Sequence, residues 1–290
     1  MSRKPQPPAQ SRPAGLDEAE LAIDPDWTTR ILAEFIAREV HRTGKRKVVL
    51  GLSGGIDSAV AAYLAVRALG PESVTCVLMP YRSSSSSSLA DAELVLQDLG
   101  TTSETIDITP MVDGFARISG EVDNLRMGNV MARCRMVLLF DRSALHDALV
   151  LGASNKTELL LGYGTWHGDM ASALNPLGDL YKTQVRELAE HLGVPESIRA
   201  KPPSADLWPD QTDESELGFS YAEVDRLLAL LVDARASRET AVELGFSKEL
   251  IERVTRMVVR SQFKRLPPVI AKVSLRSVGW DFRYPRDWKT

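Results

Sequence analysis

The hydrophobic positions in the first half of the chain follow two spacings. Short runs rich in valine and leucine, bounded by glycine or polar residues, predict strands, whereas apolar residues at helical spacing over longer stretches predict helices. The expected strands cover residues 47–52, 74–79, 104–108 and 148–151, and the expected helices cover residues 27–40, 58–69, 89–99 and 129–146. Because strands and helices alternate, we predict an α/β fold with a doubly wound parallel sheet flanked by helices.

The second half of the chain has a different pattern. Beyond Gly193 the strand signal fades into a polar, proline-containing stretch, and helices are then expected over residues 221–232, 237–244 and 247–264. This pattern predicts a helical C-terminal part. We therefore divide the chain into a proline-rich, disordered tail at 1–25, one domain over 26–268 and a C-terminal extension over 269–290.

Charge and cysteine content argue against several classes of protein. The 290 residues carry 35 lysines and arginines against 39 acidic residues, so no global positive field attracts a nucleic acid. The two cysteines, Cys76 and Cys134, lie far apart and lack neighbouring histidines, which argues against a zinc cluster or a disulfide framework. No run approaches the roughly 18 apolar residues of a membrane span, and no apolar secretory signal opens the chain. We expect a cytoplasmic protein without membrane or nucleic-acid partners.

One short segment carries the clearest chemistry. Ser53-Gly54-Gly55-Ile56-Asp57-Ser58 lies between an expected strand and an expected helix, where glycines let the backbone approach an anion and helix amides point at it. This pattern predicts a phosphate-binding loop. It is not a Walker loop, because an acid, Asp57, replaces the lysine, and an aspartate beside phosphate calls for a bridging Mg²⁺. The alternative is an ordinary strand-to-helix turn with Asp57 or Ser58 as the N-cap.

The hexapeptide resembles the pyrophosphate-binding loop of the ATP-pyrophosphatase family, whose members release pyrophosphate while adenylating an oxygen. Further segments are similar in order and spacing to NAD synthetases, and they extend the resemblance over about residues 27–268. They are Gly128-Asn129-Val130-Met131-Ala132-Arg133-Cys134-Arg135-Met136, Gly152-Ala153-Ser154-Asn155-Lys156-Thr157-Glu158, Gly178-Asp179-Leu180-Tyr181-Lys182-Thr183, and Lys201-Pro202-Pro203-Ser204-Ala205-Asp206-Leu207 followed by Asp213-Glu214. The resemblance implies a homodimeric ligase that converts deamido-NAD, ATP and ammonia to NAD, AMP and pyrophosphate through an acyl adenylate.

The resemblance also implies roles for individual residues. Asp57 and Glu158 would hold Mg²⁺, and Asp57 and Lys182 would act in catalysis, with Lys182 reaching the phosphates of ATP. Contacts with ATP are implied for Gly51, Leu52, Ser53, Gly54, Gly55, Ile56, Asp57, Ser58, Lys182 and Ser204. Contacts with deamido-NAD are implied for Arg133, Asp169, Phe263 and Lys264, whereas Arg135 is expected to be a structural ion-pair partner.

Two polar segments are interpreted as loops at the active site. The serine run at 83–88 follows an expected strand, and the resemblance implies a nucleotide-flanking loop there that is mobile when empty. Residues 201–218 resemble a second mobile loop of the family, which closes over the reacting groups. Such closure would exclude water that otherwise hydrolyses an adenylate.

Several positions depart from the family pattern. Ala153 stands where relatives carry threonine, and Trp166 and Ala173 stand where small ammonia-dependent relatives place a lysine and an aspartate that contact deamido-NAD. Gly168-Asp169-Met170 looks more like glutamine-dependent enzymes, but 290 residues leave no room for a glutaminase domain. We therefore expect free ammonia, or ammonia from a separate glutaminase subunit. Two other functions stay open: a tRNA thiolase with the same loop, and a nucleotide-binding protein without turnover.

Overall fold

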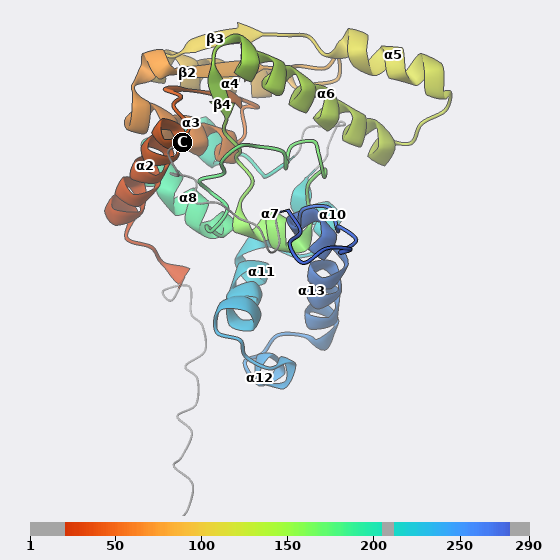
Figure 1. Ribbon diagram of the computed structural model, residues 1–290. Coiled ribbons are helices and arrows are strands. Elements are labelled where there is room, and N and C mark those ends of the chain that lie inside the picture. Colours follow the sequence, from red (N-terminus) through yellow and green to blue (C-terminus); the bar gives the residue numbers. More distant parts are fainter. Residues whose placement is uncertain (1–20, 205–211, 279–290) are drawn as a thin grey trace, which may run out of the picture.

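The computed structural model describes residues 21–204 and 212–278 (Figure 1). At the centre of the described part lies a four-stranded parallel sheet in the order β3-β2-β1-β4. The strands are β1 (Lys47–Gly51), β2 (Val74–Leu78), β3 (Thr102–Thr105) and β4 (Ala148–Val150). The chain moves outward from β1 to β3 and then returns to the opposite side of β1, so the predicted parallel sheet is confirmed. The loops after β1 and β4 leave the sheet where the strand order reverses, which is the usual ligand site of such folds.

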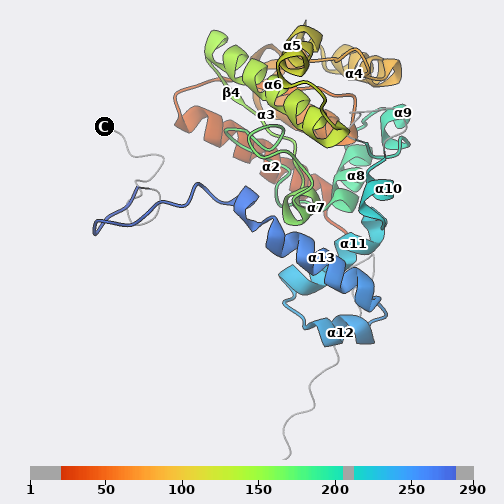
Figure 2. The ribbon, with the colours of Figure 1, turned by 90° about the vertical axis from the view of Figure 1, so that its right-hand side faces the viewer.

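Helices cover both faces of the sheet because successive strand residues point to opposite sides. On one face, Val48 and Leu50 of β1 pack with apolar side chains of four helices. These are α2 (Pro25–Arg42), α3 (Ile56–Leu69), α4 (Ser86–Leu99) and α8 (Lys182–His191). On the other face, Val49 and Val77 pack with α5 (Thr109–Ser119) and α6 (Asn124–Leu145). Figures 1 and 2 show α5 and α6 on the opposite side of the sheet from α2 and α8.

The C-terminal part forms a separate helical layer with its own apolar core. Val224, Leu227, Leu228 and Val254 are fully buried in this core. Its helices are α10 (Asp213–Leu217), α11 (Tyr221–Leu228), α12 (Arg238–Glu243) and α13 (Lys248–Arg260). The expected helix at 221–232 is α-helical only to Leu228 and continues as a π-helical turn, Ala229–Asp233. The short helix α7 (Lys156–Leu161) packs against α13 and thereby joins this layer to the end of β4.

Several element boundaries differ from the sequence-based expectation. The edge strand β3 lies at Thr102–Thr105 rather than at 104–108, because an edge strand that is largely exposed has no apolar pattern to mark it. Helix α4 begins at Ser86 with Ser85 as its N-cap, so the second half of the serine run is helical rather than a loop. Helix α5 was not expected, since Pro110 and Gly114 interrupt its pattern, although proline is well tolerated in a first helical turn.

The N-terminal end of the described chain packs against the fold, whereas its C-terminal end is exposed. Leu21 and Ile23, within the predicted tail, are held against α8: the Gln184 side chain donates to Leu21 O, and Ile23 N donates to Glu187. Residues 1–20 and 279–290 lie outside the described residues. The described part of the C-terminal extension exposes apolar side chains, including Val273 and Leu275. No helix in 21–204 or 212–278 combines the length and apolar character needed to cross a membrane.

The loop after β1 packs tightly against the start of α4. Gly54 has a φ of +78°, a left-handed conformation that favours glycine, and a Cβ there would lie 2.0 Å from Ser88 O. Gly55 has an extended backbone with a φ of −91°, and a Cβ on it would meet only the Ser53 hydroxyl at 3.3 Å. The two glycines therefore differ in how strictly the fold requires them.

We predict that Gly54→Ala destabilises the protein much more than Gly55→Ala does. Backbone strain alone costs about 1–3 kcal/mol, and the collision with a backbone carbonyl adds to it. Thermal unfolding of the two variants measures the difference, with Gly55→Ala as the matched control. Equal melting temperatures would show that the loop relaxes away from α4.

Candidate functional site

The loop after β1 is held in one shape by its own serines. Ser53 N donates to Ser58 Oγ at 3.2 Å, and Ser58 Oγ donates to Gly55 O at 2.9 Å. Gly55 N donates to Ser53 Oγ at 3.2 Å. Gly55 is the N-cap of α3 and has no side chain with which to cap the first amides of that helix. These amides are thus placed to bind an anion at the N-terminus of a 14-residue helix.

Three helix N-termini converge on one buried ammonium group. Lys182 is the first residue of α8 and its side chain is only 3% exposed. Its Nζ forms an ion pair with Asp57, from the first turn of α3, and lies 3.3 Å from Glu158 Oε1, in the first turn of α7. The structure thus brings together the three residues for which the sequence predicted metal binding and catalysis.

Asn155 links these groups, and the sequence analysis did not assign it a role. Its side chain is fully buried and donates from Nδ2 to Asp57 Oδ1 at 3.0 Å. Asn155 is also the N-cap of α7, where it forms a capping box with Glu158. The Asn-x-x-Glu spacing at the end of an expected strand was a usable signal for this helix start.

Negative charge exceeds positive charge around Lys182. Burial raises the pKa of Glu158, and the nearby Asp57 and Asp213 raise it further, although Lys182 acts in the opposite direction. Burial lowers the pKa of Lys182, but Asp57 and Glu158 outweigh burial and raise it. Burial also raises the pKa of Asp213, which accepts hydrogen bonds from Tyr163 and Tyr221. Asp57 and Glu158 thus contact the ammonium directly, and Asp213 acts on it through its charge.

The predicted deamido-NAD residues gather around a second loop, at residues 162–170. Lys264 Nζ donates to Gly162 O and Gly164 O, both at 2.8 Å, and Asp169 Oδ1 accepts from Thr165 N at 2.8 Å. Arg133 donates to Trp166 O at 3.2 Å. Phe263 lies edge-on to Trp166 with ring centres 5.3 Å apart. Asp169 therefore belongs to this loop, the other three residues contact it, and Lys264 supports its backbone.

Two further predicted residues have different surroundings. Arg135 donates from Nε to Met79 O at 3.1 Å, which is a structural contact with a backbone carbonyl. Ser204 is exposed at the end of the described segment. In the neighbouring segment, Lys201 Nζ donates to Ser88 Oγ at 3.0 Å and pairs with Asp91 at 3.2 Å. The two segments interpreted as active-site loops therefore touch each other.

The end of α7 is fixed by residues from far along the chain. Arg265 Nη1 donates to Leu159 O and Leu160 O, each at 2.9 Å, so it binds carbonyls that the helix leaves unpaired. Helix α7 ends at Leu161, and a Cβ on its C-cap, Gly162, would lie 2.1 Å from the Ser261 Cβ. The six-residue helix that carries Glu158 is therefore held at both ends by other parts of the fold.

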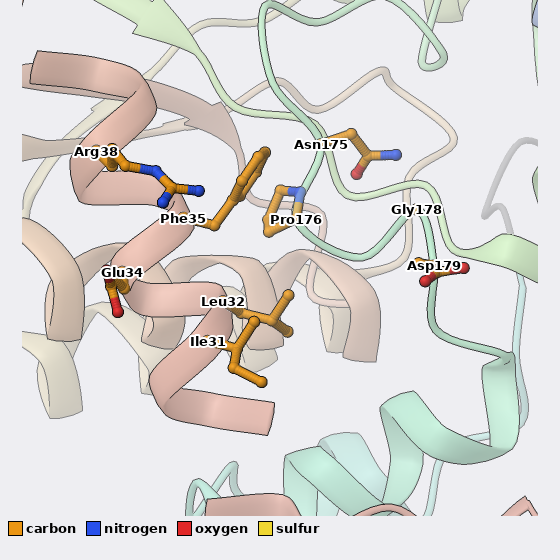
Figure 3. Close-up of a pocket in the computed structure, with 9 residues that line it drawn as sticks. All are labelled: Ile31, Leu32, Glu34, Phe35, Arg38, Asn175, Pro176, Gly178 and Asp179. Carbon is orange, nitrogen blue, oxygen red and sulfur yellow. The ribbon is translucent and has the colours of Figure 1, made fainter. Parts of the chain in front are cut away.

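A groove of about 490 Å³ lies elsewhere, between α2 and the segment 175–179. Figure 3 shows Leu32 and Phe35 on its helical side and Asn175, Pro176 and Asp179 on the facing loop. Asp57, Glu158 and Lys182 do not line this groove. It is therefore separate from the candidate active site.

We predict that metal-free wild-type protein loses stability with rising pH more steeply than Glu158→Gln. The folded protein raises the pKa of Glu158 and so binds its proton more tightly than the unfolded chain, which makes stability fall as pH rises above the ordinary value of 4.5. Urea unfolding in EDTA, from about pH 5 to about pH 8, measures the slopes. Parallel slopes would mean that Glu158 is not perturbed.

The chain was compared with known protein families and structures. The NAD synthase family model matches residues 28–268. An NH₃-dependent NAD(+) synthetase from Chlorobium phaeobacteroides is 54% identical over 274 residues, which cover 94% of this chain and 99% of the relative. This confirms the family predicted from the phosphate loop and its accompanying segments.

Solved structures agree in fold. The NH₃-dependent NAD synthetase from Campylobacter jejuni, in complex with the nitrate ion, is 37% identical with a TM-score of 0.73, covering 86% of this chain and all of that one. The NMN synthetase from Francisella tularensis is 33% identical with a TM-score of 0.78, covering 86% of this chain and 99% of that one. Sequence and fold therefore lead to one conclusion: the chain belongs to the NAD synthase family.

Proposed function

We propose that the protein is an NAD synthetase that converts deamido-NAD, ATP and ammonia to NAD, AMP and pyrophosphate. The observation that carries this proposal is the convergence of the phosphate loop, Asp57, Glu158 and Lys182 in a chain of this family. A carboxylate is not amidated directly in neutral water because its oxygen is a poor leaving group. An acyl adenylate supplies a better leaving group, AMP, which ammonia then displaces.

The residues of the chain supply binding and charge stabilisation. The first amides of α3 face the phosphates of ATP, and the serine bonds hold the loop ready for them. Lys182 would exchange part of its contact with the carboxylates for phosphate oxygens. Its ammonium would then stabilise the charge that develops on departing pyrophosphate. Because the reaction relies on positioning and charge stabilisation, none of the described residues has to act as a covalent nucleophile.

We further propose that Asp57 and Glu158 hold Mg²⁺. No group of three His, Cys, Asp or Glu side chains in the described ranges is arranged to hold a metal by itself, and we propose that phosphate oxygens of ATP complete the ligand set. Two carboxylates that complete their set with phosphate oxygens fit the preference of Mg²⁺ for hard oxygen ligands. When bound, the metal would neutralise charge on the phosphates of ATP.

The deamido-NAD end of the site is proposed to lie at residues 162–170. Arg133 and Phe263 contact this loop, Asp169 belongs to it, and the indole of Trp166 offers an aromatic surface in place of the lysine that the family pattern implies. Lys264 is proposed to act by holding the loop, since its Nζ donates to two backbone carbonyls. Stacking of deamido-NAD on the indole of Trp166 would replace the charged contact that a lysine makes at this position.

A homodimer is proposed from the exposed apolar surface of α5 and α6. Ile118 of α5 is 88% exposed, and four apolar side chains of α6 are exposed as well. These are Leu125, Val137, Phe140 and Leu145. Arg133 lies on the same helix, so an interface here would bring a second subunit close to the proposed dinucleotide site. Large exposed apolar patches are typical of protein interfaces.

The nitrogen source and compartment are also proposals. We propose free ammonium as the nitrogen source, with a separate glutaminase subunit as the alternative. Cys76 and Cys134 are both unpaired, and burial raises the pKa of each thiol. Unpaired cysteines fit a reducing compartment such as the cytoplasm.

The purified protein is expected to form NAD and AMP in equal amounts from ATP, Mg²⁺, deamido-NAD and ammonium. Glutamine should not replace ammonium, and nicotinic acid mononucleotide should be a poorer substrate by kcat/KM. A preference for the mononucleotide would instead favour the reaction named for the Francisella relative. Absence of product from both substrates would favour a nucleotide-binding protein without turnover, or a thiolase acting on RNA.

Asp57→Asn is expected to lower kcat by at least about 100-fold while the protein stays folded, because the variant loses a charge at the proposed metal site. Asp147→Asn is the control: Asp147 lies outside the site and has a φ of +53°, a conformation that asparagine tolerates. Release of pyrophosphate at the wild-type rate by Asp57→Asn would contradict the metal assignment.

Replacing Val137 or Phe140 with glutamate is expected to yield monomers, because a charge would be buried in the proposed interface. Val259→Glu is the matched control, since Val259 is 67% exposed and lies on a different helix, α13. Light scattering after size-exclusion chromatography measures the mass. A dimer that survives both α6 substitutions would place the interface elsewhere.

A further inference from the structure

A buried carboxylate lies behind the active site and has no part in the function proposed above. Asp225 is on α11, is fully buried, and sits within the helical core beside Val224, Leu227 and Leu228. A buried ionised group is costly unless it is hydrogen-bonded. An apolar side chain would fill this place without that cost, so packing alone does not explain an aspartate.

Asp225 binds the first turns of two helices at once. Its Oδ1 accepts from Thr157 Oγ1 at 2.5 Å, and its Oδ2 accepts from Thr183 N at 2.8 Å and from Thr183 Oγ1 at 2.9 Å. Thr157 belongs to the first turn of α7 and Thr183 to the first turn of α8. Carboxylates are favourable at helix N-termini because they face unpaired amides and the positive end of the helix dipole.

The two threonines are the direct neighbours of the active-site residues. Thr157 precedes Glu158 and Thr183 follows Lys182. A fourth hydrogen bond closes the network, since Lys182 N donates to Thr157 Oγ1 at 3.0 Å. The Thr157 hydroxyl therefore donates to Asp225 and accepts from the backbone of Lys182. Through this hydroxyl, the carboxylate in the helical layer is connected to both residues that face the phosphate loop.

We propose that Asp225, acting through Thr157 and Thr183, is a positioning residue that sets Lys182 and Glu158 relative to Asp57 for the reaction with ATP. This inference rests on the proposed ligase function. Asp225 has no contact with Asp57, and its effect runs through the backbone of the two helix starts. A misplacement of reacting groups by about 1 Å is enough to cost about 100-fold in rate.

Thr157 offers a matched pair of variants. Thr157→Val keeps the shape of the side chain and removes the hydroxyl, whereas Thr157→Ser keeps the hydroxyl. We expect Thr157→Val to lower kcat by about 10- to 100-fold, with KM for deamido-NAD changed by less than about threefold. Thr157→Ser should retain kcat within about threefold. Asp225→Asn should resemble Thr157→Val, because an amide nitrogen cannot accept a hydrogen bond.

The variant Asp233→Asn is a control that distinguishes a loss of active-site positioning from a general loss of stability. Asp233 also joins the two helices, since it accepts from Lys156 Nζ at 2.9 Å and from Tyr181 OH at 2.8 Å. Its side chain is 47% exposed, and Lys156 keeps a second partner in Asp179 at 3.2 Å. This variant should lower the melting temperature slightly and leave kcat unchanged.

Kinetics and thermal unfolding are measured on the same full-length preparations. Equal kcat for folded Thr157→Val and Thr157→Ser, or losses in kcat that follow only the melting temperature across all variants, would overturn the proposal. If Thr157→Val does not fold, Thr183→Val replaces it, because that change removes a single hydroxyl bond to Asp225.

Wild-type protein without turnover would refute the proposed function alone. Calorimetric binding of ATP with Mg²⁺ then decides: weaker binding to Thr157→Val than to Thr157→Ser supports positioning, and equal binding overturns it.

Discussion

The ammonium of Lys182 is the group on which the arrangement of the site depends. A lysine at a helix N-terminus faces the positive end of the helix dipole, and burying its charge without partners costs several kcal/mol. Asp57 and Glu158 compensate for both effects because their carboxylates contact the ammonium. These contacts hold the starts of α3, α7 and α8 next to one another.

Strand order brings these helix starts together. β1 leads into α3 and β4 leads toward α7, and because β1 and β4 are neighbours, Asp57 and Glu158 appear at the same edge of the sheet. Lys182 arrives by another route. The chain after α7 returns alongside β4, where Leu174 bridges to Leu151 in parallel, and Leu180 O then accepts from Lys156 N at 2.8 Å. This path places the start of α8, with Lys182, next to the carboxyl groups of Asp57 and Glu158.

The sequence predicted the parts of this design that depend on local pattern. The buried strands and the phosphate loop have strong periodicity or unusual glycines, so their place was visible, and resemblance supplied Glu158 and Lys182. The edge strand β3 and helix α5 were missed or shifted because exposure at Thr102–Thr105 and the interruption at Pro110 remove the pattern. Asn155 and Asp225 were missed because their roles depend on partners 98 and 42 or more residues away. The local signals were the Asn-x-x-Glu spacing for Asn155 and, for Asp225, an aspartate between Val224 and Leu227 in an apolar helix.

The support that Arg265 gives to α7 has a consequence for synthesis on the ribosome. The sheet and the phosphate loop are complete once β4 has emerged, so an ordered nucleotide loop can exist early. Glu158, however, sits on a helix of six residues, too short to persist alone, and its last carbonyls are bound by Arg265. A nascent chain that stops before Arg265 therefore contains the phosphate loop but lacks the support of the helix that carries Glu158. The site is therefore completed only after Arg265 has been translated, long after every strand of the described sheet.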